Sequence, residues 1–367
     1  MLSATRFPRS MLFNICGAVL CSGLSLIALA SDAAAKAQIV TFDVPGSRQE
    51  SGYGTLPFGL NAAGVSTGYY SHRRLSRGFI RTPDGQFTTF TVGKGDDTVP
   101  FGINTDGAIT GYFFSVEDAF SHGFYRDPSG QFTIFDAPGA GGFYGTDPIL
   151  INDSGTVAGY FGDDNNAIHG FIRTVDGNLT VLDVAGAGTQ SDQGTYVGSL
   201  NASGALTGYI LDNDYNAHGF FRGKNGKVAI FDVPDATGTT PSGINDRNTI
   251  CGYDTDANGA SHAFVRTADG TFSYFDVDGA GTDAGEGTVA YAINTKGLIG
   301  GYYVDSNSAY HGFVRTPKGK IKLIDAPGAG TGAVQGTFVQ SVNDAGEVLG
   351  AYIDSNNVRH GFVWTSK

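Results

Sequence analysis

The stretch INTDGAITGY at residues 103–112 recurs along the chain, and its Asn is the clearest marker of the repeat. The marker occurs at Asn61, Asn104, Asn152, Asn201, Asn245, Asn294 and Asn343, with spacings of 43, 48, 49, 44, 49 and 49 residues. A second marker, x-Gly-Phe, follows each Asn and begins at Arg77, His122, His169, His218, His262, His311 and His360, with Ala263 once in place of Gly. A period of this length indicates a solenoid, a propeller or a related array.

Each repeat contains four short stretches with the alternation and the bounding turn residues of β-strands. The first ends at the Asn, the second ends in Gly-Tyr, the third begins at x-Gly-Phe and the fourth ends in Phe-Asp. This arrangement predicts an all-β, seven-bladed β-propeller with four antiparallel strands per blade. Pro57, Pro100, Pro148 and Pro241 share one register of the first strand. Because Pro cannot donate a ladder hydrogen bond, we expect the first strand to be an edge that faces the central channel.

The two ends of the repeat region complement each other. Residues 38–43 resemble a fourth strand that lacks its three predecessors, and residues 360–365 resemble a third strand that lacks its successor. We therefore expect the N-terminal strand to complete the last blade and to close the ring, which leaves no open end for aggregation. Residues 31–367 would form a single propeller domain.

The first 30 residues have the features of a secretory signal peptide. Arg6 and Arg9 precede an apolar run at residues 11–30, which ends in the small-x-small sequence Ala28-Leu29-Ala30. An uncleaved membrane anchor is the alternative, because about 20 apolar residues can span a bilayer. We expect cleavage, and an exported monomer in the periplasm or the extracellular space with no further membrane association.

Composition excludes several classes of partner and fold. The chain has 23 Lys and Arg against 35 Asp and Glu, so its net charge is −12, which argues against a nucleic-acid partner. The 56 Gly disfavour helices, and a 41% hydrophobic content disfavours disorder. Two of the three Cys fall in the signal region, so Cys251 is expected to be a buried filler without a disulfide partner.

His262-Ala263-Phe264, the recurrent Ile-Asn-x-x-Gly and the Gly-Tyr pairs resemble the HAF family of extracellular bacterial repeat proteins. The resemblance covers the whole mature chain, although most copies here have His-Gly-Phe. It implies secretion and a propeller-type repeat fold. It brings no catalytic residues, and we assign none.

We define the top face as the one that carries the starts of the first and third strands and the ends of the second and fourth; the bottom face is opposite. His begins the third strand and Asp ends the fourth in most repeats, but the first blade has Arg77 and Thr91 instead. This joint replacement predicts a contact between the two residues, because a buried Asp without its partner is costly. We expect a structural network of the pairs His122–Asp136, His169–Asp183, His218–Asp232, His262–Asp276, His311–Asp325 and His360–Asp43; a catalytic Thr–His–Asp relay is the alternative.

The loops that join successive blades lie on the top face and vary in sequence, which is typical of binding loops on a rigid scaffold. Aromatic rings beside charged residues in these loops suit stacking on sugars or gripping a peptide, and the basic residues near 72–77 suit an anionic ligand; packed linkers and a solvated loop are the alternatives. The candidate ligand-binding residues are Tyr53, Arg73, Arg77, Phe143, Tyr144, Tyr196, Asp283 and Glu286.

Asp254, Asp256 and Asn258 are spaced like the opening of a calcium loop. The twelfth position would be Val265 instead of a bidentate Glu, and Asp and Asn are also common turn residues. Calcium is therefore an optional cofactor, and none is required.

These features favour an exported, non-enzymatic propeller that binds an extracellular carbohydrate or protein through its top-face loops. Two alternatives stay open. One is an extracellular propeller lyase or hydrolase that acts on a polymeric or cyclic substrate, and the other is a structural module of an envelope or matrix.

Overall fold

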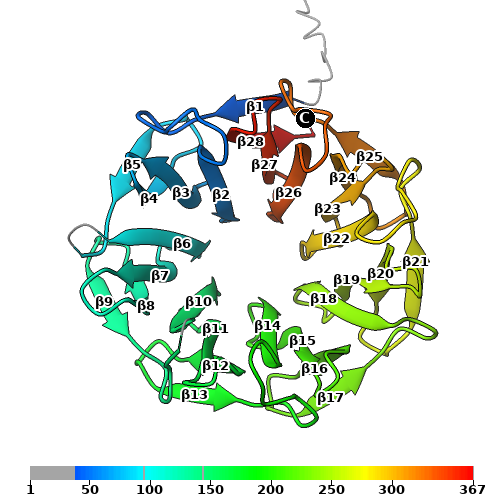
Figure 1. Ribbon diagram of the computed structural model, residues 1–367, viewed down its shortest axis with the longest axis horizontal. Coiled ribbons are helices and arrows are strands. Elements are labelled where there is room, and N and C mark those ends of the chain that lie inside the picture. Colours follow the sequence, from blue (N-terminus) through cyan, green and yellow to red (C-terminus); the bar gives the residue numbers. More distant parts are fainter. Residues whose placement is uncertain (1–37, 94–95, 143, 367) are drawn as a thin grey trace, which may run out of the picture. The chain divides into compact units, whose positions relative to one another are not determined.

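The computed structural model describes residues 38–93, 96–142 and 144–366, so the predicted signal peptide lies outside the described residues. Every regular secondary-structure element in these described residues is a β-strand. The strands are arranged around a central axis (Figure 1). In the described ranges, no helix is long and apolar enough to cross a membrane.

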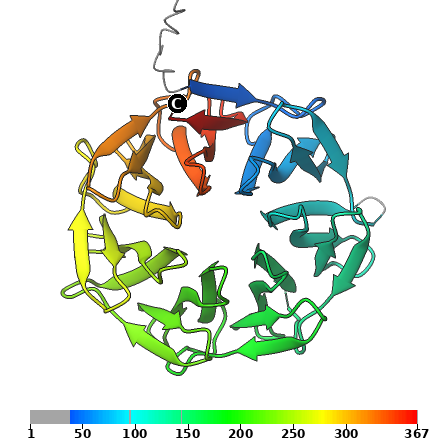
Figure 2. The same cartoon turned by 180° about the vertical axis from the view of Figure 1, so that it is seen from behind.

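The strands form antiparallel meanders of four, each running from an inner strand near the axis to an outer strand at the circumference (Figures 1 and 2). The inner strands are β2 (Thr55–Leu60), β6 (Asp97–Ile103), β10 (Thr146–Ile151), β14 (Gly194–Leu200), β18 (Gly238–Ile244), β22 (Gly287–Ile293) and β26 (Gly336–Val342). The second strands are β3 (Ser66–His72), β7 (Ile109–Ser115), β11 (Val157–Gly162), β15 (Leu206–Leu211), β19 (Ile250–Thr255), β23 (Ile299–Val304) and β27 (Val348–Ile353).

The third and outer strands complete these meanders. The third strands are β4 (Leu75–Arg81), β8 (Phe120–Arg126), β12 (Ile168–Arg173), β16 (Ala217–Arg222), β20 (Ser261–Arg266), β24 (Tyr310–Arg315) and β28 (Arg359–Thr365). The outer strands are β5 (Phe87–Phe90), β9 (Phe132–Phe135), β13 (Leu179–Leu182), β17 (Val228–Phe231), β21 (Phe272–Phe275), β25 (Ile321–Ile324) and β1 (Gln38–Phe42). β1, from the other end of the chain, pairs antiparallel with β28, with Gln38 opposite Thr365 and Phe42 opposite Gly361.

The inner strands that contain Pro have a register shift next to it. In β2 and β6, the register with the second strand shifts immediately after Pro57 and Pro100, as in a β-bulge. Both strands are edges of their sheets, so the missing N–H group of Pro breaks no ladder. The prediction that the Pro-containing strand is the innermost edge is confirmed.

The hydrophobic core lies between neighbouring meanders and is built on the x-Gly-Phe sequence. Its Phe is fully buried in every repeat, as in Phe79 and Phe362. The ring of Phe79 packs edge-on against Phe42, an outer-strand residue of the preceding meander, with ring centroids 6.3 Å apart. Gly361 leaves room for that same Phe42 ring, since a Cβ there would lie only 2.4 Å from it. An outer-strand ring such as Phe42 therefore lies over the Gly of its own meander and packs against the buried Phe of the next meander.

The marker Asn residues are buried at the bottom face, where they link each meander to the next. The Oδ1 atom of Asn201 accepts the backbone N–H groups of Ser203 and Ala205, both at 3.0 Å, and so holds its own turn. The Nδ2 atom of each Asn donates to the backbone carbonyl of the next marker Asn. The pairs are Asn61 to Asn104 (3.0 Å), Asn104 to Asn152 (3.3 Å), Asn152 to Asn201 (3.1 Å), Asn201 to Asn245 (3.0 Å), Asn245 to Asn294 (3.1 Å), Asn294 to Asn343 (2.9 Å) and Asn343 to Asn61 (3.1 Å). We call these residues the Asn circle.

Replacing one member of the Asn circle should destabilise the fold more than replacing an exposed turn Asn. We expect Asn201→Ala to lower the free energy of unfolding by about 2–4 kcal/mol, because it leaves buried backbone groups without partners. Asn201→Asp keeps the acceptor for the turn but places a carboxylate oxygen against the Asn245 carbonyl, so its loss combines the broken link between meanders with the cost of a buried charge. Urea unfolding gives these values. Asn225→Ala, at an exposed turn, is the control and should cost less than about 1 kcal/mol. Equal losses at both positions would contradict a linking role for the Asn circle.

Candidate functional site

The recurrent His residues lie at the top face, and each is close to the outer-strand Asp with which it was predicted to pair. The distances from Nδ1 to the nearer carboxylate oxygen are 3.0 Å for His122–Asp136, 2.7 Å for His169–Asp183, 3.0 Å for His218–Asp232, 2.9 Å for His262–Asp276, 3.3 Å for His311–Asp325 and 2.9 Å for His360–Asp43. Every predicted pair is therefore brought together.

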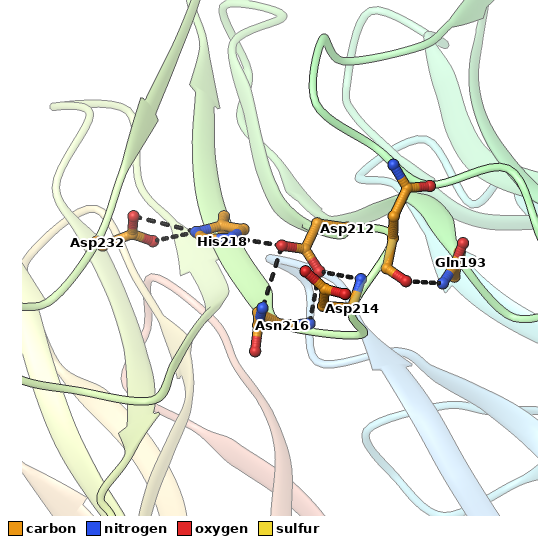
Figure 3. Close-up of polar contacts among 7 residues, drawn as sticks. Gln193, Asp212, Asp214, Asn216, His218 and Asp232 are labelled. Atoms are coloured by element: carbon orange, nitrogen blue, oxygen red, sulfur yellow. Dashed lines mark hydrogen bonds and ion pairs between the residues drawn. The ribbon is translucent and has the colours of Figure 1, made fainter.

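Each His also has a second carboxylate near Nε2, which sequence reasoning missed. Figure 3 shows His218 between Asp232 and Asp212, whose carboxylate oxygen lies 3.4 Å from Nε2. The corresponding pairs are His122–Asp118 (2.9 Å), His169–Asp163 (3.8 Å), His262–Asp256 (3.7 Å), His311–Asp305 (3.5 Å) and His360–Asp354 (3.7 Å). In most copies this Asp comes six residues before the His, a spacing that is visible in the sequence. The strand register places His72 at the equivalent position of the first repeat, so all three polar residues are replaced there together.

The two carboxylates determine the charge state of the ring. Burial alone would lower the pKa of His218, but the hydrogen bonds with Asp232 and Asp212 outweigh burial and raise it. For His360, the hydrogen bond with Asp43 is the main cause of a raised pKa. The ring of His218 thus bridges the outer-strand Asp232 and the loop residue Asp212. Neither ring nitrogen of His218 is left free to act on a substrate.

The His–Asp pairs should be energetically coupled. We expect a double-mutant cycle on His218→Ala and Asp232→Ala to give a coupling energy of about 0.5 kcal/mol, because the two side chains share a charge-assisted hydrogen bond at a partly exposed site. The unfolding free energies of the four proteins supply the cycle. Ser129→Ala combined with Asp232→Ala is the control, since Ser129 contacts Asp127 in a different repeat and its loss should be additive. Additive losses for His218 and Asp232 would contradict the network.

The predicted ligand residues of the first repeat are connected through Arg48. The Arg48 guanidinium carbon lies 3.5 Å from the centre of the Tyr53 ring, and Nη1 donates to the backbone carbonyl of Arg73 at 2.8 Å. Tyr53 and Arg73 are exposed. Arg77 differs, because its Nε is buried and has no hydrogen-bond partner among the described residues. Tyr53 and Arg73 thus face solvent, whereas Arg77 occupies the place of a network His.

Tyr144 and Tyr196 are brought together by Asp192. The Tyr144 hydroxyl donates to the Asp192 carboxylate, and the Tyr196 hydroxyl donates to the Asp192 backbone carbonyl at 2.7 Å. Asp147 was missed by sequence reasoning. It lies opposite Tyr160 on the inner strand, and burial raises the pKa of its carboxyl to about 7. Phe143, also predicted to bind ligand, lies outside the described residues.

Asp283 and Glu286 have different environments within one loop. Asp283 is exposed, but Glu286 is buried and accepts the backbone N–H of Asp283 at 3.0 Å. Gln193 and Gln335 make the equivalent contact in their own loops, with N–H groups at 3.1 Å. The Glu286 side chain therefore closes its loop and does not face outward toward a ligand.

The predicted calcium residues serve a turn and a strand. Asp256 Oδ1 accepts the backbone N–H groups of Asn258 (2.8 Å) and Ala260 (2.9 Å), which is ordinary turn chemistry. Asp254 is buried on β19 opposite His262, and burial raises its pKa to about 6. Within the described ranges, no group of three or more His, Cys, Asp and Glu side chains is arranged to hold a metal ion. Calcium binding stays a prediction.

A cavity of about 410 Å³ opens at the top end of the axis, between residues of β2, β22 and β26. Five of its eleven lining residues are aromatic, among them Tyr69, Tyr291, Tyr302 and Phe338, and the lining includes one cation, Arg359. Burial raises the pKa of Tyr302, so this phenol is neutral at physiological pH. The signal that could have found the site is the Tyr that ends the second strand in most repeats. A second cavity of about 210 Å³ lies at the bottom face against the Asn circle.

No protein-family model and no curated protein matches the chain. Solved structures do match it. A streptogramin B lyase is 16% identical over 89% of this chain and 97% of its own, with a TM-score of 0.58. The virginiamycin B lyase of Staphylococcus aureus is 14% identical over 89% of this chain and 100% of its own, with a TM-score of 0.57. A puromycin hydrolase is 14% identical over 84% of this chain and 51% of its own, with a TM-score of 0.54.

The chain has a propeller-type, all-β fold. The expected fold class is confirmed at this level by its antiparallel meanders and by the propeller architecture of these neighbours. At such identities the likeness concerns the fold and carries no information about activity. The resemblance to the HAF repeats stays a prediction.

Proposed function

We propose that the mature chain is an exported, closed, seven-bladed propeller that binds a carbohydrate at the top of its central channel without converting it. The blade number and the closure are supported by the antiparallel pairing of β1 with β28 and by the Asn circle, which returns from Asn343 to Asn61. Export rests on the sequence of residues 1–30 alone.

Removing the N-terminal strand should open the proposed ring. Deletion of residues 31–46 removes Phe42, whose ring packs against Phe79 and Phe87 in the neighbouring blade, so we expect the melting temperature to fall by about 10 °C or more. Calorimetry measures this shift. Val40→Ala changes an exposed side chain of the same strand and should shift the melting temperature by about 2 °C or less. An unchanged melting curve for the deletion would contradict closure by this strand.

The aromatic cavity is the observation that carries the proposed binding function. Its volume lies in the range of small-ligand pockets, and its lining combines rings with a small number of polar groups. Tyr rings can stack on the C–H faces of a sugar, and their hydroxyl groups can bond its hydroxyl groups. A concave site of this size fits one or two sugar units better than it fits the flat surface of a folded protein.

A lyase or hydrolase is the second candidate, and Asp147 favours it. A carboxyl group with a pKa near 7 is suited to proton transfer at neutral pH, and its buried Oδ1 has no hydrogen-bond partner among the described residues. Under this candidate, Asp147→Asn would abolish turnover of a bound substrate and preserve its binding.

Binding should depend on the cavity rings and not on exposed Tyr residues elsewhere. We expect Tyr302→Ala to weaken the best ligand from a glycan array by about tenfold or more, because it removes a wall of the cavity. Titration calorimetry measures the dissociation constant. Tyr274→Ala, on outer strand β21 and half exposed, is the matched control and should leave affinity unchanged. Equal effects of the two variants, or no ligand on the array, would contradict the proposal.

A further inference from the structure

Arg359 is the one charged side chain among the described residues that line the top cavity. Its Nη1 donates a hydrogen bond to the Tyr69 hydroxyl at 3.4 Å, and a hydroxyl does not neutralise the charge of the guanidinium. No carboxylate of the described chain lies within ion-pair distance of this guanidinium, although the protein has a net charge of −12. An acidic protein therefore carries an uncompensated cation inside a ring-lined cavity.

The residue at this position differs from its equivalents in the other repeats. The residue before the x-Gly-Phe sequence is Ser76, Ser121, Ile168, Ala217, Ser261 and Tyr310 elsewhere, and none of these is charged. A structural Arg that is buried or partly buried recurs at a different place, the end of the third strand. Arg315, for example, lies 4.5 Å from the ring centre of Phe275. Arg359 has no such ring among the described cation–π contacts, so packing does not account for it.

The backbone of Arg359 is fixed by the loop that enters the first blade. Its N–H donates to the carbonyl of Tyr53 at 2.8 Å, and Arg359 forms a parallel bridge with Gly54. A Cβ on Gly54 would lie 2.0 Å from the Arg359 carbonyl oxygen, so only Gly permits this approach. The base of the side chain is thereby held in place before any ligand arrives, which lowers the entropic cost of binding.

We infer that the carbohydrate is acidic and that its carboxylate binds the guanidinium of Arg359 while its ring lies against the cavity tyrosines. This inference rests on the proposed function. A guanidinium presents parallel N–H donors that match a carboxylate, and charge-assisted bonds of this kind are stronger in a partly enclosed site than in water. The chemical class is a uronate-containing oligosaccharide.

The test compares an acidic sugar with its neutral counterpart. Titration calorimetry is run with tetragalacturonate and with the same tetramer after reduction of its carboxyl groups. We expect the acidic form to bind about 10- to 100-fold tighter, and Arg359→Ala to remove that difference while the neutral tetramer binds as before. Arg359→Lys keeps the charge and loses the paired donors, so it should recover only part of the difference. Arg247→Ala, at an exposed turn of the bottom face, is the control and should change neither affinity.

Failure of the inference and failure of the proposed function have different signatures. Equal binding of both tetramers, lost in Tyr302→Ala, would overturn the acidic preference and leave the carbohydrate site intact. An acidic preference that survives Arg359→Ala and disappears in Arg73→Ala would move the anion site to the loop and overturn the inference. Binding of neither tetramer to the intact protein, with capture of oligoglutamate instead, would overturn the carbohydrate function itself. The comparison of the two tetramers on the unmodified protein stays decisive if a variant does not fold.

Discussion

The side-chain amide of each marker Asn joins a turn to the neighbouring repeat. Its oxygen holds the turn of its own meander and its nitrogen reaches the backbone of the next, so one buried group satisfies two demands. The spacings between markers vary from 43 to 49 residues, yet the Nδ2-to-carbonyl distances stay between 2.9 and 3.3 Å. The extra residues are absorbed on the top face. β18 begins seven residues after the end of β17, whereas β14 begins twelve after β13.

This difference between the two faces explains why the bottom-face residues have nearly the same sequence in each repeat, whereas the top-face loops differ. At the bottom face, replacing a marker Asn breaks a hydrogen bond with the neighbouring repeat. Replacing a core Phe likewise removes a packing contact with the neighbouring repeat. At the top, loops are free to differ, and the residues that depart from the repeat accumulate there. Asp147 occupies a position that is uncharged in the other repeats, and Arg359 does the same. Positions that break a local pattern without a structural reason are the best indicators of function in a repeat protein.

Sequence reasoning reached the parts that depend on spacing within one repeat. The propeller-type fold follows from the period, and the pair His218–Asp232 follows from the joint change at Arg77 and Thr91. The recurrent Tyr of the second strand marked Tyr69 and Tyr302, but the repeat pattern did not show that they share a cavity with Arg359, because the three residues come from different repeats and meet only in the folded chain. The environment of Glu286 could not be predicted for a related reason. Whether a loop acid faces solvent or its own backbone depends on the loop conformation, and spacing does not reveal that.

The chemistry at the cavity favours holding a ligand over converting it. The Tyr302 phenol has a raised pKa, so at neutral pH it donates hydrogen bonds and offers a ring but is a poor base. The ring of His218 is occupied by acids on both sides, and Asp147, whose pKa suits proton transfer, is not among the residues that line the cavity. A lyase needs its base beside the reacting carbon, whereas binding needs only rings, hydroxyl groups and a fixed counter-charge. The cavity has all three of these: the aromatic walls, their phenols and Arg359, whose backbone is anchored at Gly54.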